Sequence, residues 1–288
     1  MAKPAQQTTI ARPVKEKGIG LHTGEMCAVC LLPAEPDAGI VFVARDGTEI
    51  PALADRVVET TRGTVLGVGS ARVGGVEHLM AAAYGLGVDN MRITVEGPEL
   101  PACDGSSAPW ARALRAAGRR RLGAGRRTRT LSRPVWIAAE ETWLMVAPAS
   151  RGLSLAVAVQ YDGTVAGRQT YWLQLTPKGF ETELAPARTF AMLHELEALR
   201  ARGLARGGTE DTAFAVLSDS YSGPLRFDDE VVRHKMLDLV GDLALCGERF
   251  HGHVVAIRPG HHANVALARG LREAFDRPDL SRAEARSD

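Results

Sequence analysis

Short apolar runs separated by turn residues dominate the first half of the chain, a pattern typical of β-strands. IGLHTG, MCAVCLL and GIVFVARDG are expected to be strands. GGVEHLMAAAYGLG predicts a helix that opens at Gly75 and closes at Gly85 and Gly87, and NMRITVEG follows as a strand. SSAPWARALRAAG predicts a second helix with Ser107 as its N-cap.

The second half opens with PVWIAAE, TWLMVAPA and LSLAVAVQYDG, whose apolar, β-rich composition predicts further strands. Helices are expected at 191–202, 229–246 and 263–276, with FAVLSD and GHVVAIRPG as strands between them. RRRLGAGRRTRTLSR joins the two halves and contains almost no apolar residue, so it is interpreted as an exposed connection. A nucleic-acid patch is the alternative, but no aromatic residue is interleaved to stack on bases.

The two halves share one order of features, namely a helix with an early histidine, a glycine stop and then a strand. His78 begins the first such helix, and MRITV follows it. His234 begins the second helix, which stops at Gly247 and leads into HVVAI. This order predicts a duplicated α+β unit whose two helices face each other, so that their histidines converge.

Composition narrows the class of protein. The chain has 288 residues and a net charge of +1, so no overall field favours nucleic acid or an acidic membrane. No apolar run reaches the ~20 residues of a membrane-spanning helix, and the N-terminus lacks the apolar core of a secretory signal. Four cysteines are too few for a disulfide framework, and the pair Cys27 and Cys30 has no second pair for a structural zinc site.

A cytoplasmic protein fits this composition, and the halves suggest where its domains divide. The expected organisation has a first domain, a basic linker and a second domain, at 1–120, 121–132 and 133–288. The last residues of the second domain, about 12 of them, are expected to form a disordered tail.

His234, Asp238 and Asp242 are spaced i, i+4 and i+8 in a predicted helix, so their side chains share one stripe. A histidine and a carboxylate one turn apart can bind one cation, although a solvated face with an ion pair has the same spacing. The neighbouring pair Glu77 and His78 favours a metal site over a solvated face. A catalytic zinc has three protein ligands and an open position for water. His78, His234 and Asp238 would supply the three, and Glu77 could accept the proton of that water.

A hydrolase also needs a general acid for the leaving amine. His261 and His262 lie in the predicted turn between a strand and a helix, and nothing intrinsic to the sequence separates them. Asp242 could pair with His261 and keep it protonated. A surface role is the alternative for either histidine.

Five segments together resemble the UDP-3-O-acyl-N-acetylglucosamine deacetylase family: IGLHTG, GVEHLMAAAYGLGVDN, PARTFAM, RFDDEVVRHKMLDLVGDLALCG and GHHAN. Their order and spacing match from about residue 8 to 275. The resemblance implies two similar α+β domains, each a sheet layered against paired helices, with a zinc cleft between them. It also implies hydrolysis of the 2-acetamido group of UDP-3-O-[(3R)-hydroxyacyl]-N-acetylglucosamine to the amine and acetate. This is the committed step of lipid A synthesis in the bacterial cytoplasm.

The resemblance also implies a role for each matching residue. His78, His234 and Asp238 match the zinc ligands, and Glu77 matches the general base. His261 matches the general acid.

The remaining matches concern the surroundings of these groups. Asp242 matches the aspartate that supports the acid, and Asn264 matches the asparagine of the same segment. Thr189 matches a hydroxyl that helps to hold the oxyanion. Lys235 and Phe190 match residues expected to contact the sugar nucleotide.

Three places depart from the family pattern, namely Thr61-Arg62-Gly63, Ala102-Cys103 and Glu210. They leave the acyl-chain preference open, and they motivate an alternative, a related zinc amidase acting on another N-acylated amino sugar. Fe²⁺ accepts the same ligands as Zn²⁺. The expected partner is the small-molecule substrate, without nucleic acid or a transmembrane segment, and the expected state is a monomer.

Overall fold

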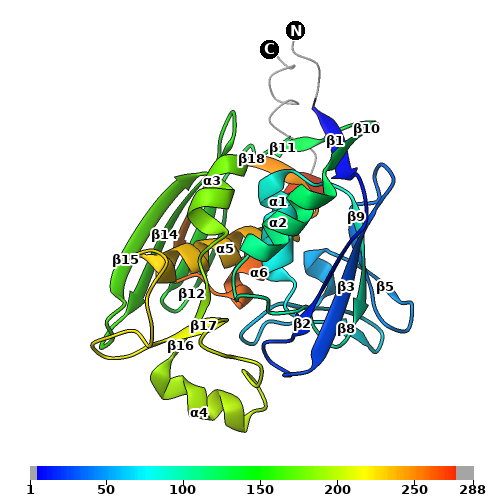
Figure 1. The fold of residues 1–288 in the computed structure, drawn as a ribbon. Coiled ribbons are helices and arrows are strands. Elements are labelled where there is room, and N and C mark those ends of the chain that lie inside the picture. The colour runs from blue at the N-terminus through cyan, green and yellow to red at the C-terminus, as the bar shows by residue number, and fades with distance from the viewer. Residues whose placement is uncertain (1–4, 277–288) are drawn as a thin grey trace, which may run out of the picture.

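The computed structural model describes residues 5–276, and it is a mixed α/β protein in which helices lie between two large sheets (Figure 1). The first sheet has five strands, in the order β2 (Val14–Ile19), β3 (Met26–Pro33), β9 (Met91–Glu96), β4 (Ile40–Val43) and β5 (Glu49–Pro51). The second sheet follows the order β12 (Val135–Ala139), β13 (Thr142–Pro148), β18 (Arg249–Ile257), β14 (Leu153–Tyr161) and β15 (Gly167–Gln174). A sixth strand, β11 (Thr128–Thr130), also pairs with β18.

Both sheets have the same pairing pattern around a central strand. β9 is antiparallel to β3 and parallel to β4, and β18 is antiparallel to β13 and parallel to β14. The outer strands β2, β5, β12 and β15 are antiparallel to their neighbours. Each central strand follows a helix and a glycine of positive φ, Gly87 or Gly247, at φ 80° in both cases. The order that the sequence repeats, a helix, a glycine and then a strand, therefore leads in both halves to the central strand of a sheet.

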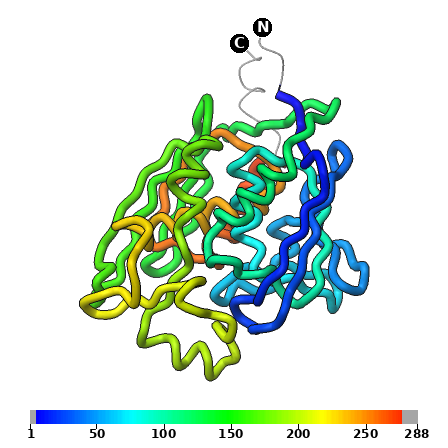
Figure 2. Tube along the Cα trace, viewed as in Figure 1, coloured from blue at the N-terminus to red at the C-terminus, as the bar shows by residue number. Residues whose placement is uncertain are grey.

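Four helices fill the space between the sheets: α1 (Glu77–Leu86), α2 (Ala108–Ala117), α5 (Glu230–Ala244) and α6 (His261–Asp276). α2 packs on β2, α5 packs on β14 and β15, and α6 packs on β12 and β13. α1 packs against both α2 and α5. The tube in Figure 2 shows the cyan α1 between the blue strands of the first sheet and the orange α5. The helix layer therefore brings the two histidine-bearing helices into contact.

α1 and α5 approach each other so closely because α5 has a glycine at the crossing. A Cβ atom at Gly241 would overlap the backbone oxygen of Glu77. A similar approach occurs at the other end of α1, where a Cβ at Gly85 would overlap the ring of Phe180. Side chains larger than hydrogen at these positions would push the helices apart, and the residues on their facing sides would separate with them.

Smaller elements complete the fold. Two antiparallel groups are β1 (Gln6–Ile10) with β10 (Arg119–Gly125), and β6 (Val57–Glu59) with β7 (Val65–Val68) and β8 (Ala71–Val73). β16 (Thr189–Met192) is parallel to β17 (Ala213–Val216), and α4 (Leu193–Ala201) connects them. The remaining short helical turns are Ala54–Arg56, Pro177–Gly179 and Phe180–Leu184. Between residues 5 and 276, no helix combines the length and apolar content that spanning a membrane requires.

The structure differs from the sequence-based expectations in several local features. IGLHTG was expected to be a strand, but β2 ends at Ile19 and a turn follows it. The segment 121–132 is largely exposed, as expected of a connection, yet it contributes to strands β10 and β11. Ser107 occupies the N-cap position of α2, but its hydroxyl donates to the backbone oxygen of His78 instead of capping the helix. The expected disordered tail lies outside the described residues.

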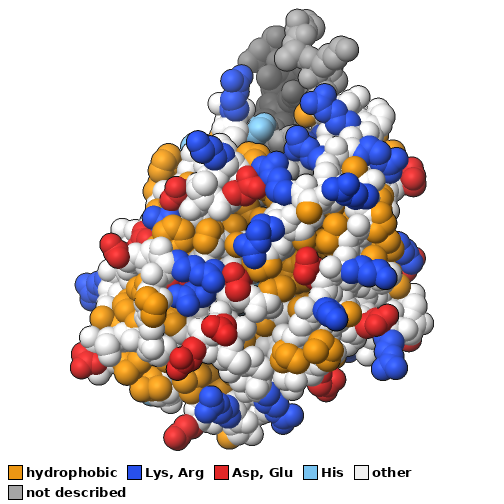
Figure 3. Space-filling model, viewed as in Figure 1, with side chains coloured by type: hydrophobic (Ala, Val, Ile, Leu, Met, Phe, Trp, Pro, Cys, Tyr) orange, Lys and Arg blue, Asp and Glu red, His pale blue; other side chains and the backbone are white. Residues whose placement is uncertain are grey.

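Acidic and basic side chains are interspersed over much of the face in Figure 3, as the net charge of +1 suggests. Basic side chains gather in the upper part of that view, over β10. This segment is the one whose composition suggested either an exposed connection or a nucleic-acid patch.

Candidate metal centre

Three side chains from two helices converge at one point between the sheets. His78 lies on α1, while His234 and Asp238 lie one turn apart on α5. One nitrogen or oxygen atom from each lies within 4.8 Å of the others. The Oδ1 atom of Asp238 lies 3.5 Å from His78 Nε2 and 3.4 Å from His234 Nε2. Two imidazoles and a carboxylate at this spacing can hold one divalent cation.

The α5 stripe is buried, which excludes the alternative of a solvated face. His234, Asp238 and Asp242 are all at most 3% exposed. Asp238 Oδ1 has no hydrogen-bond partner among the described residues, although it is buried. A buried carboxylate oxygen without a donor is costly, and a cation would satisfy it. This oxygen is the one that faces both imidazoles.

Charge and burial act differently on the two histidines. Burial lowers the pKa of His234 to about 4, and the positive side chain of Lys235 acts in the same direction. Burial also opposes protonation of His78, but the nearby negative carboxylate of Asp238 raises its pKa above the ordinary value. His234 Nδ1 lies 3.1 Å from the backbone oxygen of Ala187. If Nδ1 carries the proton and donates it there, the lone pair of Nε2 points into the site.

Glu77 is buried at the start of α1 and lies on the wall of the same cavity. Its Oε2 atom accepts a hydrogen bond from the backbone N–H of Thr64, at 3.1 Å. The hydroxyl of Thr64 donates to Asp242 Oδ1, at 2.6 Å. One threonine in the loop before β7 therefore holds the carboxylates of both helices in place.

His261 is paired with Asp242, as the sequence suggested, and His262 is exposed. His261 Nδ1 lies 2.9 Å from Asp242 Oδ2, which also accepts from the amide of Asn264 at 2.9 Å. Burial opposes the charged form of His261, but the charges of Asp242 and Asp238 raise its pKa to about 9. His261 is the first residue of α6, not part of a preceding turn as expected, so the helix fixes its backbone.

A cavity of about 590 Å³ opens beside these residues, and both halves of the chain line it. Thr189 and Phe190 of β16 line one wall, and the Phe190 ring packs edge-on against His234 at 5.9 Å between centroids. Lys235 also faces the cavity, and its Nζ donates to Asp238 Oδ2 at 2.9 Å. The structure thus brings the proposed ligands, base and acid, together with Thr189, Phe190 and Lys235, to a single site.

A family model described as UDP-3-O-acyl N-acetylglycosamine deacetylase matches residues 7–273. The chain belongs to this deacetylase family. Its relatives named UDP-3-O-acyl-N-acetylglucosamine deacetylase include a protein of Syntrophotalea carbinolica, 41% identical over 90% of this chain and 85% of the relative. A relative from Anaeromyxobacter dehalogenans is 42% identical over 91% of this chain and 86% of the relative. A relative from Leptospira biflexa is 38% identical over 91% of this chain and 88% of the relative.

One of the departures from the deacetylase family pattern lies at the cavity. Arg62 has a left-handed backbone, at φ 62°, and its guanidinium lies 2.7 Å from Glu195 of α4. Both side chains line the cavity, so the pair joins the loop before β7 to α4 across its wall. Cys103 is also left-handed, at φ 54°, whereas Glu210 lies exposed in the turn before β17.

Sequence reasoning about this deacetylase missed three residues of the site. Thr64 was overlooked because a threonine in a short loop has no distinctive spacing. Tyr161 and Arg258 line the cavity from the ends of β14 and β18. Polar residues at or directly after the ends of two neighbouring parallel strands were a signal that could have found both.

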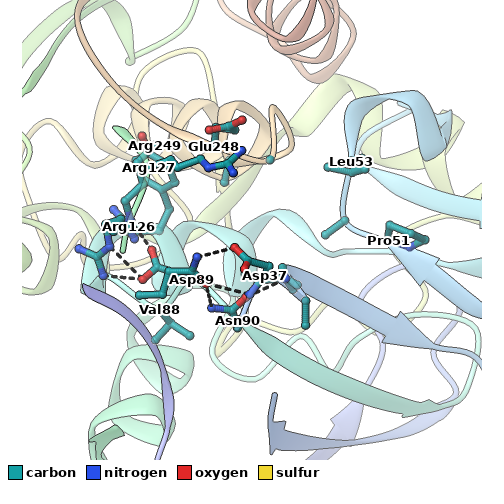
Figure 4. A pocket seen from close by; sticks show the side chains of 18 of the residues that line it. Asp37, Pro51, Leu53, Val88, Asp89, Asn90, Arg126, Arg127, Glu248 and Arg249 are labelled. Carbon is teal, nitrogen blue, oxygen red and sulfur yellow. Dashed lines mark hydrogen bonds and ion pairs between the residues drawn. The ribbon is translucent and has the colours of Figure 1, made fainter. Parts of the chain in front are cut away.

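A second pocket of the deacetylase, of about 410 Å³, lies at the C-terminal ends of α1 and α5 (Figure 4). Several of its polar side chains are paired with one another. Asp89 binds Arg126 at 2.6 Å and Arg249 at 2.9 Å, and Gln7 donates to Asp37 at 2.6 Å. No histidine lines it. These contacts tie three elements to the first sheet, namely β1, β18 and the segment that follows β10. The pocket is therefore better explained as a structural joint than as a site of chemistry.

Proposed function

We propose that this chain hydrolyses the N-acetyl group of UDP-3-O-[(3R)-hydroxyacyl]-N-acetylglucosamine, giving the free amine and acetate, as the committed step of lipid A biosynthesis. The convergence of His78, His234 and Asp238 beside Glu77 and His261 carries the proposal, and membership of the deacetylase family supports it. The four cysteines are free, which suits the reducing bacterial cytoplasm where we place the reaction. The basic segment has no part in this function, so no nucleic-acid partner is proposed.

The proposed architecture is two domains, 1–120 and 133–288, joined by 121–132, with the cleft between them. Each contains one five-strand arrangement and one of the two facing helices, α1 or α5, that supply the histidine ligands. His78, His234 and Asp238 would hold a zinc ion, and the unsatisfied oxygen of Asp238 supports this assignment. A zinc ion bound there would supply a Lewis acid and would lower the pKa of a water molecule to about 7. Fe²⁺ would suit the same donors.

Glu77 is the proposed general base. Its carboxylate lines the cavity, and the Thr64 N–H fixes Oε2, which leaves Oε1 free to take a proton from the attacking water. This proton transfer forms the nucleophile at the wall of the cavity, next to the residues that hold the metal. General-base catalysis of this kind contributes about 10²- to 10⁴-fold to the rate.

His261 is the proposed general acid. Asp242 accepts from Nδ1, so Nε2 is free to donate a proton to the departing amine. The hydroxyl of Thr189 is proposed to donate to the oxyanion that develops on the acetyl carbonyl. Phe190 and Lys235 line the same cavity, and they are proposed to contact the sugar nucleotide.

One observation favours a second candidate, a related amidase acting on another N-acylated amino sugar. The Arg62–Glu195 ion pair places charge on a wall of the cavity, and Arg62 belongs to one of the segments that depart from the family pattern. An acyl chain of the expected kind would have to pass beside this pair or displace it.

Metal analysis combined with an acetate-release assay tests both candidates. Purified protein loaded with Zn²⁺ is expected to release acetate from the acylated UDP-sugar and to lose activity on chelation. Simple N-acetylglucosamine derivatives serve as the comparison substrates. Cleavage of these derivatives without cleavage of the UDP-linked substrate would replace the deacetylase with the second candidate, and activity unaffected by metal removal would contradict both.

A further inference from the structure

The lining of the site cavity is not uniform. Where strands β14 and β18 end, the lining is polar and charged, and Arg258 pairs with Glu141 there. Along β16, toward α4, the lining includes three apolar residues: Leu21 of the first half, with Ala191 and Met192 of β16. We call these three residues the apolar wall. A substrate with a charged head and an apolar chain would place its chain on this wall, because burial of apolar surface is favourable.

An ion pair lies where the apolar wall ends. Glu195 is in the first turn of α4, three residues after Met192, and Arg62 reaches it from the loop before β7. The Nη2 and Oε1 atoms of the two side chains are 2.7 Å apart, and both side chains line the cavity. They are 44% and 31% exposed, so the pair lies between the cavity and solvent. Within residues 5–276, it is the one ion pair that α4 forms.

Next to this ion pair, the wall of the cavity is closed by backbone contacts. The N–H of Gly207, in the segment after α4, donates to the backbone oxygen of Leu21 at 3.1 Å, and the N–H of Arg206 donates to that of His22 at 3.2 Å. A Cβ atom at Gly207 would overlap the backbone oxygen of Gly20. The two segments therefore leave no room for a substrate between them. The ion pair is a part of this wall that side chains alone close.

The loop that carries Arg62 is held from the other side. Arg62 has a left-handed backbone, at φ 62°, a conformation that glycine adopts more readily than arginine. Two residues later, Thr64 donates its N–H to Glu77 and its hydroxyl to Asp242. The loop cannot withdraw Arg62 far from the cavity without disturbing these contacts. Its guanidinium is therefore directed at α4 by a fixed backbone.

We propose that the Arg62–Glu195 ion pair is a specificity-determining closure of the apolar wall, and that it limits the length of the acyl chain. This inference rests on the proposed function, hydrolysis of an acylated UDP-sugar. An acyl chain that ends before the pair gains from each methylene that it buries on the apolar wall. A longer chain must separate the two charges or cover them with apolar groups, and either change opposes binding.

The strength of the pair makes this selection graded. Burial of one methylene corresponds to about a fourfold gain in affinity. The value of kcat/KM should therefore rise with acyl length and then stop rising at the length that reaches the pair. A partly exposed ion pair contributes little free energy, so its loss should change the preference by about fivefold at most. The pair thus favours shorter chains without excluding longer ones.

A series of substrates tests the proposal on the full chain. We would measure acetate release from UDP-3-O-acyl-N-acetylglucosamines that differ only in the length of a saturated acyl chain. In the wild type, kcat/KM should show a break with length. R62G removes the guanidinium and suits the left-handed backbone, while E195Q removes only the charge of the partner. Each variant should move the break to longer chains and raise the ratio of long-chain to short-chain kcat/KM about fivefold.

Two further variants complete the design. R62E combined with E195R reverses the pair and should restore the wild-type break. R92Q is the matched control, because it breaks a similarly exposed pair with Glu49 on the first sheet, away from the cavity, and should leave the break in place.

The outcomes separate this inference from the proposed function. Acetate release that rises with acyl length without a break in the wild type would overturn the inference and leave the function standing. A break that E195Q does not move would also overturn it, and a shift in R62G alone would assign the selection to the loop backbone instead of the ion pair. Absence of acetate release from every member of the series would contradict the proposed function, and this inference with it.

Discussion

The two central helices, α1 and α5, begin alike and carry different chemistry. In α1 the histidine is preceded by Glu77 and followed at four and eight residues by Ala82 and Leu86. In α5 the equivalent residues are Arg233, Asp238 and Asp242. A shared strand order is thus compatible with different roles. α1 supplies the proposed base and one proposed ligand, and α5 supplies two proposed ligands and the carboxylate proposed to support the acid.

The residue before each histidine provides the strongest test of this division. Glu77 faces the cavity, whereas Arg233 binds Asp229 at 2.5 Å and Glu183 at 2.7 Å and stacks on Tyr171. E77Q should lower kcat by about three orders of magnitude, because proton transfer is lost, while zinc content stays at the wild-type level. R233Q should mainly lower the melting temperature.

Zinc content is measured beside the rate, with H78A as the reference for a lost ligand. If zinc in E77Q falls as far as in H78A, Glu77 is a ligand and the assigned role is wrong. A large loss of turnover in R233Q at full stability would remove the contrast between the helices.

The proposed acid depends on α5, and its loss is expected to have the second largest effect. H261Q should lower kcat about 100-fold with a much smaller change in KM, because the side chain acts on the departing amine. H262Q is the matched control, since that neighbour is exposed. Steady-state kinetics of both variants decide the assignment, and equal losses would leave neither histidine as the specific donor.

The contact between the helices can be tested through stability. G241A places a methyl group against the backbone of Glu77, and the expected destabilisation is about 1–3 kcal/mol. G123A is the control, because a Cβ there meets nothing within 4 Å. Denaturant unfolding of both variants provides the measurement. An unchanged free energy of unfolding in G241A would show that the helices can separate without cost.

The smallest effect is a shift in pH dependence. His261 has a raised pKa of about 9, so its protonated form is present below that pH and is lost as the pH rises through it. The wild-type rate should therefore fall above about pH 9. D242N removes the negative charge that raises this pKa, so the basic limb of kcat should move to lower pH. T64V removes only a hydrogen bond to Asp242 and should shift the limb less.

Much of this site could be predicted from the sequence because helical spacing is regular. The spacing of His234, Asp238 and Asp242 determines that they share a face, whatever surrounds the helix. Their burial and their closeness to His78 depend on the contact between α1 and α5. In the sequence, only the repeated order of helix, glycine and strand in the two halves indicated this contact. Thr64 could not be predicted, because its role depends on two carboxylates from distant helices.

The strands show a similar limit. β14 was expected from its apolar run, but β15 was overlooked because its outward side includes Arg168 and Thr170. The arginines of β10 concealed a paired strand, since backbone pairing with β1 does not require an apolar side chain.

The contacts around Asp89 affect how the protein unfolds. A single carboxylate binds Arg126 of the joining segment and Arg249 of β18, so opening either half breaks contacts of the other. Two units with the same strand order would otherwise be expected to melt one after the other. Here heating should give one calorimetric peak, and a protease that cuts the chain near the joint should release no independently folded fragment.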